Sequence, residues 1–228
     1  MVFPNETDRL AAILEHHGIP VDRSVFDLNF MEEDTETLQR LFSREGVAAE
    51  RKNIAVVVGA KRPQNRWPIA NFRKVIESLG SGYNFILVGG PDDREMAATL
   101  RELPQVHDFC GRLTPVQNAI LFGKCALVLS NDTGPMHLAY SVGTPLVALF
   151  SSRDFPGKWY PPASEFNHVF RTENVHCSLC LSDHCSNNIC MQAIQPAAVA
   201  TKVMELLCKS GYSPAQTISA TGTTSWLN

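Results

Sequence analysis

The sequence has 228 residues, of which 44% are hydrophobic and 19% charged, with a formal net charge of −3 at pH 7. This composition predicts a globular chain with a core, and the small negative charge gives no general case for nucleic-acid binding. No apolar run approaches the ~20 residues of a membrane helix, and the opening MVFPNETDRLAA lacks the features of a signal peptide. We therefore expect a cytoplasmic protein without a transmembrane segment, whose seven cysteines are mostly thiols or metal ligands.

The first 50 residues predict two helices and little core. Residues 7–17 and 32–45 have helical spacing, and the second segment carries acidic residues in its first turn, where they favour the helix dipole. Residues 25–30 form a short extended segment between them. Because two such helices enclose little apolar surface, residues 1–50 are expected to be a lead-in or linker.

From residue 54 onward, apolar runs alternate with helical patterns. Buried strands are predicted at 54–58, 84–88, 127–129 and 146–149, with weaker strands at 106–109 and 168–171. Helices are predicted at 69–79, 94–103, 115–123, 134–142 and 196–207. This alternation predicts βαβ units and a parallel sheet. We therefore expect an α/β, Rossmann-like domain over residues 51–208 and a disordered tail over 209–228.

The stretch 127–149, LVLSNDTGPMHLAYSVGTPLVAL, predicts a strand, a polar turn, a short helix and a second strand. The N–H groups of Gly134, Met136 and His137 are expected to be free at the helix N-terminus, at the carboxyl end of the strand. Such a position commonly binds anions and ligands. Asp132 can accept hydrogen bonds from sugar hydroxyls, and His137 can donate one to a phosphate. The same pattern also fits a strand–turn–helix unit that binds nothing.

Positive charge is concentrated between residues 51 and 74, which contain seven Lys and Arg residues and no Asp or Glu. This local field suits a phosphorylated ligand, although a solvated basic face would have the same composition. The sequence contains neither GxGxxG nor a Walker A loop. A dinucleotide oxidoreductase or a P-loop NTPase is therefore disfavoured.

Four cysteines cluster late in the chain, namely Cys177, Cys180, Cys185 and Cys190. Their spacing leaves open a zinc ion that pins a loop, buried thiols, or a disulfide. The other three cysteines, Cys110, Cys125 and Cys208, have apolar neighbours and are predicted to be core residues.

Several motifs, taken in their order and spacing, resemble the C-terminal half of glycosyltransferase family 9, the lipopolysaccharide heptosyltransferase family. They are NRWP, GGPDDRE, CGRLTPVQNAILFGKC, NDTGPMHLAYSVGTPLVALF, KWYPP and CMQAI. The resemblance covers residues 6–207, and NDTGPMHLA is its most specific part. It implies a GT-B architecture, in which two Rossmann-like domains face each other and the C-terminal one holds a sugar nucleotide.

The resemblance also implies a donor-binding site without a cofactor or metal. Asp132, Thr133 and Gly134 would contact the donor diphosphate and sugar, and the loop 59–67 would lie over the diphosphate. For Met136 a packing role is left open. The implied donor-binding residues are Lys61, Asn65, Arg66, Asp132, Thr133, Gly134, Met136 and His137. Helix N–H groups and cations at such a site would stabilise the negative charge of a leaving nucleoside diphosphate.

Two departures from the family pattern affect this prediction. Family members often carry a lysine where this chain has Asn65, and Lys61, Arg62 or Arg66 are the candidates to replace it. The acceptor domain, which would carry the general base, is not represented, because only ~50 residues precede the first strand, too few for such a domain. No catalytic base can therefore be nominated, and a separate N-terminal half is an expected partner.

The resulting prediction is a heptosyltransferase-like enzyme. It would move a sugar from a nucleoside diphosphate donor, ADP-heptose by analogy, to a lipopolysaccharide core or another lipid-linked glycan. It would work in the cytoplasm, peripherally at the inner membrane. A non-catalytic nucleotide-sugar-binding module is the alternative, and a sugar-nucleotide epimerase of the same fold is a third.

Overall fold

The computed structural model describes residues 5–21 and 28–210. One parallel sheet of six strands has the order β3-β2-β1-β4-β5-β6. The strands are β1 (Lys52–Val57), β2 (Tyr83–Val88), β3 (Val106–Asp108), β4 (Leu127–Asn131), β5 (Leu146–Phe150) and β6 (Asn167–Arg171). The predicted parallel α/β sheet is confirmed, and every strand expected from the sequence is present.

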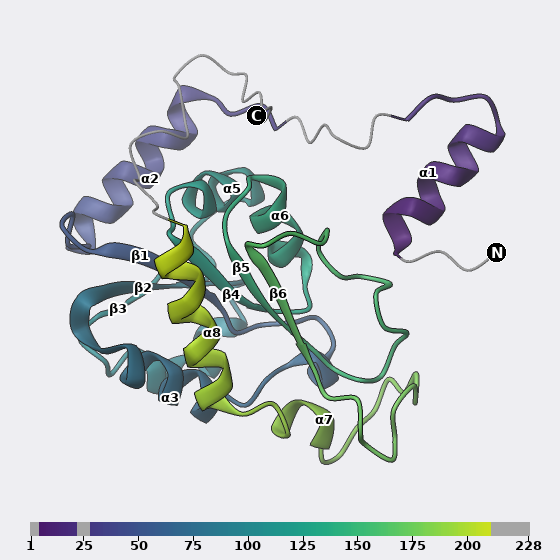
Figure 1. Cartoon of the computed structure of the whole chain (residues 1–228). Helices are drawn as coiled ribbons and strands as arrows, with labels where there is room; N and C mark the ends of the chain where they lie inside the picture. Colours follow the sequence, from purple (N-terminus) through teal and green to yellow (C-terminus); the bar gives the residue numbers. More distant parts are fainter. Residues whose placement is uncertain (1–4, 22–27, 211–228) are drawn as a thin grey trace.

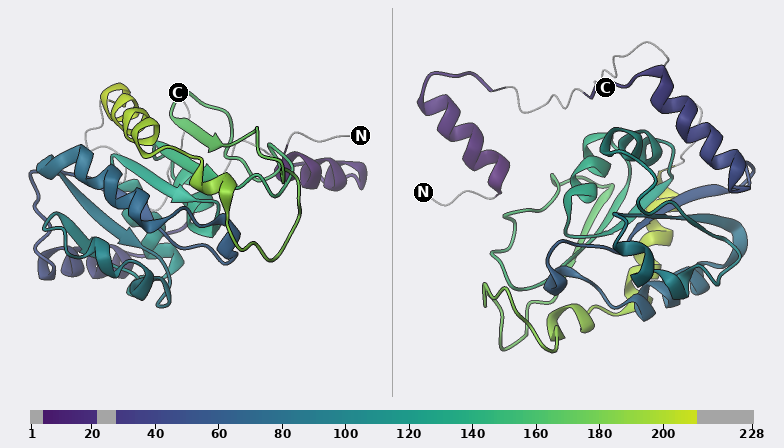
Figure 2. Two further views of the ribbon diagram at one scale, coloured as in Figure 1. Left: turned by 90° about the horizontal axis from the view of Figure 1, so that it is seen from below. Right: turned by 180° about the vertical axis from the view of Figure 1, so that it is seen from behind.

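Helices lie on both faces of this sheet (Figures 1 and 2). The α-helices are α1 (Glu6–His16), α2 (Glu32–Arg44), α3 (Ile69–Leu79), α4 (Asp93–Met96), α5 (Pro115–Gly123), α6 (Gly134–Ser141), α7 (Ile189–Gln192) and α8 (Pro196–Lys209). Short 3-10 helices are η1 (Pro63–Asn65), η2 (Gly80–Gly82) and η3 (Ala98–Leu100). Helices α3 and α8 pack together on one face, whereas α2, α5 and α6 cover the other.

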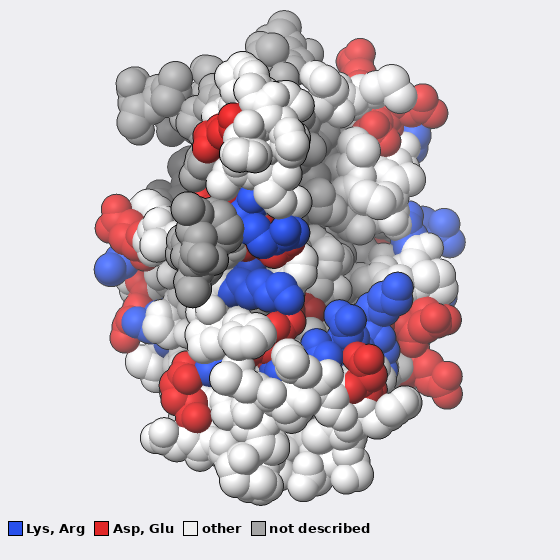
Figure 3. All heavy atoms as spheres, turned by 90° about the vertical axis from the view of Figure 1, so that its right-hand side faces the viewer, with Lys and Arg blue, Asp and Glu red and all other residues white. Residues whose placement is uncertain are grey.

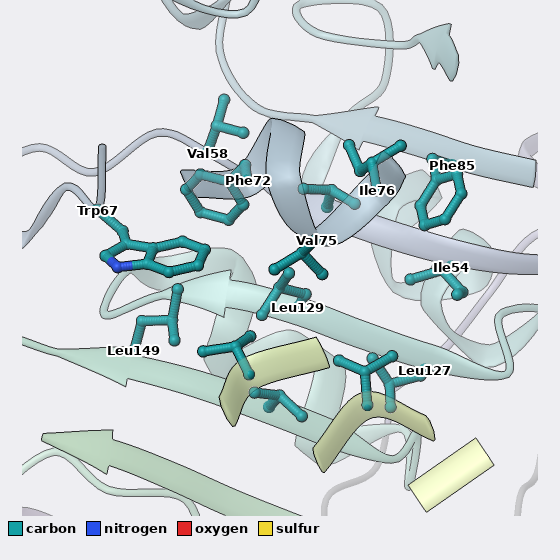
Figure 4. Packing of buried hydrophobic residues seen from close by; sticks show 14 of the residues in the cluster. Ile54, Val58, Trp67, Phe72, Val75, Ile76, Phe85, Leu127, Leu129 and Leu149 are labelled. Atoms are coloured by element: carbon teal, nitrogen blue, oxygen red, sulfur yellow. The ribbon is translucent and has the colours of Figure 1, made fainter. Parts of the chain in front are cut away.

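The core has two layers because successive strand residues point to opposite faces. In β1, Ile54 and Val56 face α3 and α8, whereas Ala55 and Val57 face α5 and α6. Figure 4 shows the first layer, in which Trp67, Phe72 and Leu149 lie close together. Both faces of the strands are therefore buried, which explains why the strands read as continuous apolar runs.

Helix α5 begins where its sequence predicts. The Thr114 hydroxyl accepts a hydrogen bond from the Gln117 N–H, and the Gln117 side chain accepts one from the Thr114 N–H. This reciprocal pair satisfies two N–H groups that a helix start leaves without partners.

The prediction of a single helix over residues 94–103 is wrong, because two short helices, α4 and η3, occupy this region. The Leu100 N–H donates to the Ala97 carbonyl, three residues back. Ala97 and Leu100 are both fully buried in the core. A three-residue period puts these two side chains on the same face, so burial favours the tighter turn over a regular α-helix.

The two helices of the lead-in differ in how they contact the rest of the chain. Helix α2 packs on α5 and buries Leu38, whereas α1 lies to one side of the body (Figure 1). The Glu6 N–H of α1 donates to the Lys158 carbonyl. Within the described ranges no helix is long and apolar enough to cross a membrane.

Two predicted segments are covered only in part. Residues 25–27 of the extended segment lie outside the described residues, and residues 28–30 have no regular structure. Of the predicted disordered tail, 211–228 lies outside the described residues, whereas Lys209 ends α8.

Candidate functional site

The strand order reverses between β1 and β4. From β1 the chain moves outward to β2 and β3, and from β4 it moves outward to β5 and β6 in the opposite direction. In open α/β sheets, ligands bind outside the carboxyl ends of the strands at such a switch point. Here the loop 59–67 after β1 is hydrogen-bonded to Asn131 and Asp132 at the end of β4 and to Ser151 after β5.

Asn131 fixes the loop 59–67 to the sheet. It ends β4, is fully buried, and accepts a hydrogen bond from the Trp67 N–H (3.0 Å). Its amide donates to the Val58 carbonyl (2.7 Å). The sequence predicted a turn residue here, but the structure makes Asn131 a strand residue that holds both ends of the loop.

Asp132 lies at the centre of a short hydrogen-bonded chain. The Asn65 amide donates to Asp132 Oδ2 (2.8 Å), and the Ser151 hydroxyl donates to Asn65 Oδ1 (2.7 Å). The three residues come from the loops that follow three adjacent strands. Asn65 therefore orients the Asp132 carboxylate, and it occupies the position where the resemblance expected a lysine.

Burial makes the negative charge of the Asp132 carboxylate energetically unfavourable. Burial raises the pKa of the Asp132 carboxyl from its ordinary value of 3.8 to about 6, and Asp154 contributes in the same direction. Arg153 and Arg62 act oppositely, because nearby positive charge favours the carboxylate. A half-buried carboxylate at a sheet's ligand-binding edge is characteristic of functional sites.

The start of α6 only partly matches the prediction. Thr133 is the N-cap residue, but its side chain makes no capping hydrogen bond. Gly134 is exposed, and a Cβ placed on it would meet nothing within 4 Å. The Met136 N–H is not free, because it donates to the Thr133 carbonyl, and the Met136 side chain is fully buried. The packing role left open for Met136 is therefore the one that the structure favours.

His137 lies half-buried one turn into α6. Its Nδ1 is 3.4 Å from the Tyr140 hydroxyl, and the two rings meet edge to face. Burial lowers the pKa of His137, which favours the neutral imidazole at pH 7. A neutral ring keeps one N–H donor for a ligand.

Cations from two loops surround this edge. Lys61 and Arg62 are exposed, whereas Arg66 folds back and donates to the Ala60 carbonyl (2.8 Å). Arg153, in the loop that follows β5, is largely buried and was not predicted. Figure 3 shows Lys and Arg side chains gathered in the middle of one face of the molecule, with acidic side chains among them. The rule that drew attention to the end of β4 would also have found Arg153 at the end of β5.

Asp93 is a second residue that sequence reasoning missed. Its carboxylate accepts a hydrogen bond from the Gly90 N–H (2.8 Å). A Cβ on Gly59 or Gly89 would collide with the Asp93 side chain where it now lies, so the two glycines leave room for this carboxylate. The GGPDDRE motif thus holds a carboxylate between the ends of β1 and β2.

The cysteines and tryptophans fall into different environments. Cys110 and Cys125 are core residues, as predicted, and burial raises the pKa of both thiols, but Cys208 is exposed because it lies on the outer side of α8. Cys190 is buried, Cys177 is half-buried, and Cys180 and Cys185 are exposed. Among the described residues, no group of three or more His, Cys, Asp or Glu side chains is arranged to hold a metal.

The tryptophans Trp67 and Trp159 also differ in burial. Trp67 is buried and donates to the Ile194 carbonyl, whereas Trp159 is partly exposed.

Comparisons with known proteins agree with this architecture. The model of glycosyltransferase family 9 (heptosyltransferase) matches residues 7–190. Lipooligosaccharide heptosyltransferase 2 of Haemophilus influenzae is 31% identical over 147 residues, which are 61% of this chain and 42% of that protein. The chain therefore spans less than half the length of this relative.

Two solved structures share the fold. The family 9 glycosyltransferase of Veillonella parvula is 25% identical with a TM-score of 0.74, and the match covers 90% of this chain and 60% of that one. The ADP-heptose lipopolysaccharide heptosyltransferase II of E. coli is 24% identical with a TM-score of 0.67, covering 84% and 57%. At this identity, the second likeness concerns the fold alone.

Proposed function

Because the chain belongs to glycosyltransferase family 9, we propose that it is the sugar-nucleotide-binding half of a heptosyltransferase-like enzyme. The observation that carries this proposal is the position of Asp132, whose half-buried carboxylate lies at the switch point of the sheet beside the start of α6. The donor half comprises residues 51–208, and residues 1–50 lead into it.

The proposed chemistry follows from the polar groups at this edge. Asn65 hydrogen-bonds to Oδ2 of Asp132, and within the described part of the chain no residue donates to Oδ1. A donor sugar hydroxyl would fill that acceptor. The exposed start of α6 at Gly134, the Thr133 hydroxyl and the neutral His137 are close to Asp132 in the chain and would supply further donors.

The leaving group of glycosyl transfer is a nucleoside diphosphate, which gains negative charge as the glycosidic bond breaks. The helix start and the cations of the loop 59–67, Lys61 and Arg66 among them, would stabilise this charge by pre-oriented dipoles and positive charge. Of the donors, ADP-heptose is preferred, because E. coli heptosyltransferase II carries that substrate in its name. The acceptor would be a lipopolysaccharide core or a related lipid-linked glycan, at the cytoplasmic face of the inner membrane.

The general base that activates the acceptor is assigned to an N-terminal half outside this chain. This assignment is consistent with the comparisons, in which the chain spans less than half of its relatives. A non-catalytic binding module remains the second candidate, and Asn65 in place of the family's lysine favours it.

Calorimetric titration with ADP, GDP and UDP tests the binding proposal. One nucleotide should bind, and Asp132→Ala and His137→Ala should each weaken its binding, the first by about tenfold or more. His168→Ala is the matched control, because His168 lies near the amino end of β6, away from the site. Absence of binding by every nucleotide, or equal binding by wild type and Asp132→Ala, would contradict the proposal.

A second experiment separates the enzyme from the binding module. The chain is mixed with the N-terminal half of a family 9 heptosyltransferase, ADP-heptose and acceptor, and product is measured. Product that disappears with Asp132→Ala supports the enzyme. Nucleotide binding without product supports the module.

A further inference from the structure

One acidic side chain bridges two arginines beside Asp132. A single oxygen of Asp183, Oδ1, accepts hydrogen bonds from Arg62 Nε (3.4 Å) and from Arg153 Nη2 (3.2 Å). The arginines come from the loops after β1 and β5, and Asp183 lies about 30 residues beyond Arg153 in the cysteine-containing segment. Two guanidinium groups that converge on one carboxylate oxygen have the arrangement that a phosphate oxygen would also satisfy.

Arg153 has hydrogen-bond partners besides the Asp183 carboxylate. Its guanidinium also donates to the carbonyls of Ser182 (3.0 Å) and Leu181 (3.1 Å). Its side chain is only 10% exposed, whereas that of Asp183 is 71% exposed. Asp154 lies 4.0 Å from Arg153 but also pairs with Lys158. The buried cation therefore keeps carbonyl partners, whereas the carboxylate that pairs with it is exposed to solvent.

Backbone hydrogen bonds also tie the segment that carries Asp183 to the residues after β5. The Leu179 N–H donates to the Ser152 carbonyl (2.7 Å) and the Leu181 N–H to the Arg153 carbonyl (2.9 Å). Leu179 and Leu181 both have positive φ, at 59° and 50°. Left-handed backbone is unfavourable for leucine, so this segment is held in a strained conformation at the site.

The two arginines lie near enough to Asp132, the proposed ligand-binding residue, to affect its charge. The positive charges of Arg153 and Arg62 both reach Asp132, where they favour its ionised form. We propose that Arg62 and Arg153 form a binding site for the diphosphate of the ligand, and that Asp183 occupies this site until the ligand displaces it. This inference rests on the proposed function and adds the cations that replace the lysine missing at position 65.

Occupation by Asp183 has a measurable consequence. An anionic ligand must compete with the carboxylate, so removal of the Asp183 charge should tighten anion binding. Removal of Arg62 should weaken it. Both side chains substituted here, Asp183 and Arg62, are exposed, and ion pairs of exposed side chains contribute modestly. Each change should therefore alter the dissociation constant by roughly two- to fivefold, and more at low salt.

Inorganic pyrophosphate is the probe, titrated calorimetrically into the wild-type chain and into Asp183→Asn and Arg62→Gln. Both substitutions are on exposed side chains and should leave the fold intact. Glu165→Gln is the matched control, since it also removes one negative charge but lies before β6, at the opposite end of the sheet's strands. We expect tighter binding with Asp183→Asn, weaker binding with Arg62→Gln, and an unchanged constant with Glu165→Gln.

The proposal is overturned if Asp183→Asn behaves as Glu165→Gln does, or if neither the wild type nor Asp183→Asn binds pyrophosphate. A titration with ADP on the same variants keeps the two proposals apart. Loss of ADP binding in Asp132→Ala without any effect of Asp183 or Arg62 would remove this inference alone. A pyrophosphate response at Asp183 and Arg62 without nucleotide binding would remove the proposed function alone.

Discussion

Adjacent residues at the end of β4 have opposite roles. Asn131 turns inward and joins the loop 59–67 to the sheet, whereas Asp132 carries a charge at the edge proposed to bind the ligand. The hydrogen bonds of Asn131 stabilise the folded chain, whereas the buried charge of Asp132 destabilises it. Substitutions at these two positions should therefore change the free energy of unfolding in opposite directions.

Asn131→Ala should destabilise the chain by about 2–4 kcal/mol, because it leaves the buried Trp67 N–H and Val58 carbonyl without partners. Urea unfolding followed by circular dichroism measures the change. Asn167→Ala is the control, since it removes one exposed hydrogen bond to Pro162 and should cost less than about 1 kcal/mol. Equal effects of the two substitutions would contradict the role of Asn131 in fixing the loop 59–67 to the sheet.

Asp132 makes stability depend on pH. Its pKa is about 6 in the folded chain and near 3.8 in the unfolded chain, so between these values only the folded chain holds the proton. Stability should therefore be highest below pH 4 as far as this group is concerned, and should fall as pH rises to about 6, by roughly 2–3 kcal/mol in total. Asp132→Asn should remove this decrease and be more stable than wild type at pH 7. Denaturant unfolding at pH 4.5 and 7.5 measures both, and parallel pH profiles of the two proteins would refute the assignment.

At the scale of elements, the polar groups of the site come from strand ends, and the helices hold those ends in place. Helix α5 packs against α2 and α6 on one face of the sheet. A stable start of α5 therefore supports the packing of α6. The capping box at Thr114 is local and depends only on the residues of one turn.

Thr114→Ala should lower the free energy of unfolding by about 1 kcal/mol, because the Gln117 N–H loses its acceptor. Thr114→Ser keeps the hydroxyl and should stay within about 0.5 kcal/mol of wild type. Thermal or chemical unfolding of the three proteins decides this. A loss of stability of the same size in Thr114→Ser would assign the effect to the methyl group and not to the cap.

At the scale of the whole molecule, α2 belongs to the core and α1 contacts the body lightly. Leu38 on α2 is 1% exposed within the core layer of α5 and α6, whereas Leu10 on α1 is 50% exposed. Arg112 and Glu45 add an ion pair between the segment after β3 and the end of α2 (2.7 Å). The predicted boundary between a lead-in and a domain at residue 50 stays a prediction, and the packing of α2 bears directly on it.

Leu38→Ala should destabilise the whole chain by about 2–5 kcal/mol in a single transition, because it opens a cavity in the shared core. Leu10→Ala should change stability by no more than about 0.5 kcal/mol. Unfolding monitored by circular dichroism and by tryptophan fluorescence reports both. An early separate transition for Leu38→Ala would mean that α2 unfolds apart from the sheet.

The sequence by itself determined the strands, most helices, the parallel sheet and the place of the polar residues at the end of β4. These features are local, since apolar runs, caps and turn residues act over a few positions along the chain. It failed at 94–103, where the burial of Ala97 and Leu100 overrode helical spacing.

Only the tertiary structure decided which distant side chains meet. Asn65 and Asp132 are 67 positions apart, and Arg62 and Asp183 are 121 apart, so no local pattern links them. The strand order β3-β2-β1-β4-β5-β6 brings their loops to one edge. The packing that fixes this order depends on the whole core. For that reason the sequence predicted the edge of the candidate site and, by resemblance, the loop 59–67, but not the contacts made by Ser151, Arg153 and Asp183.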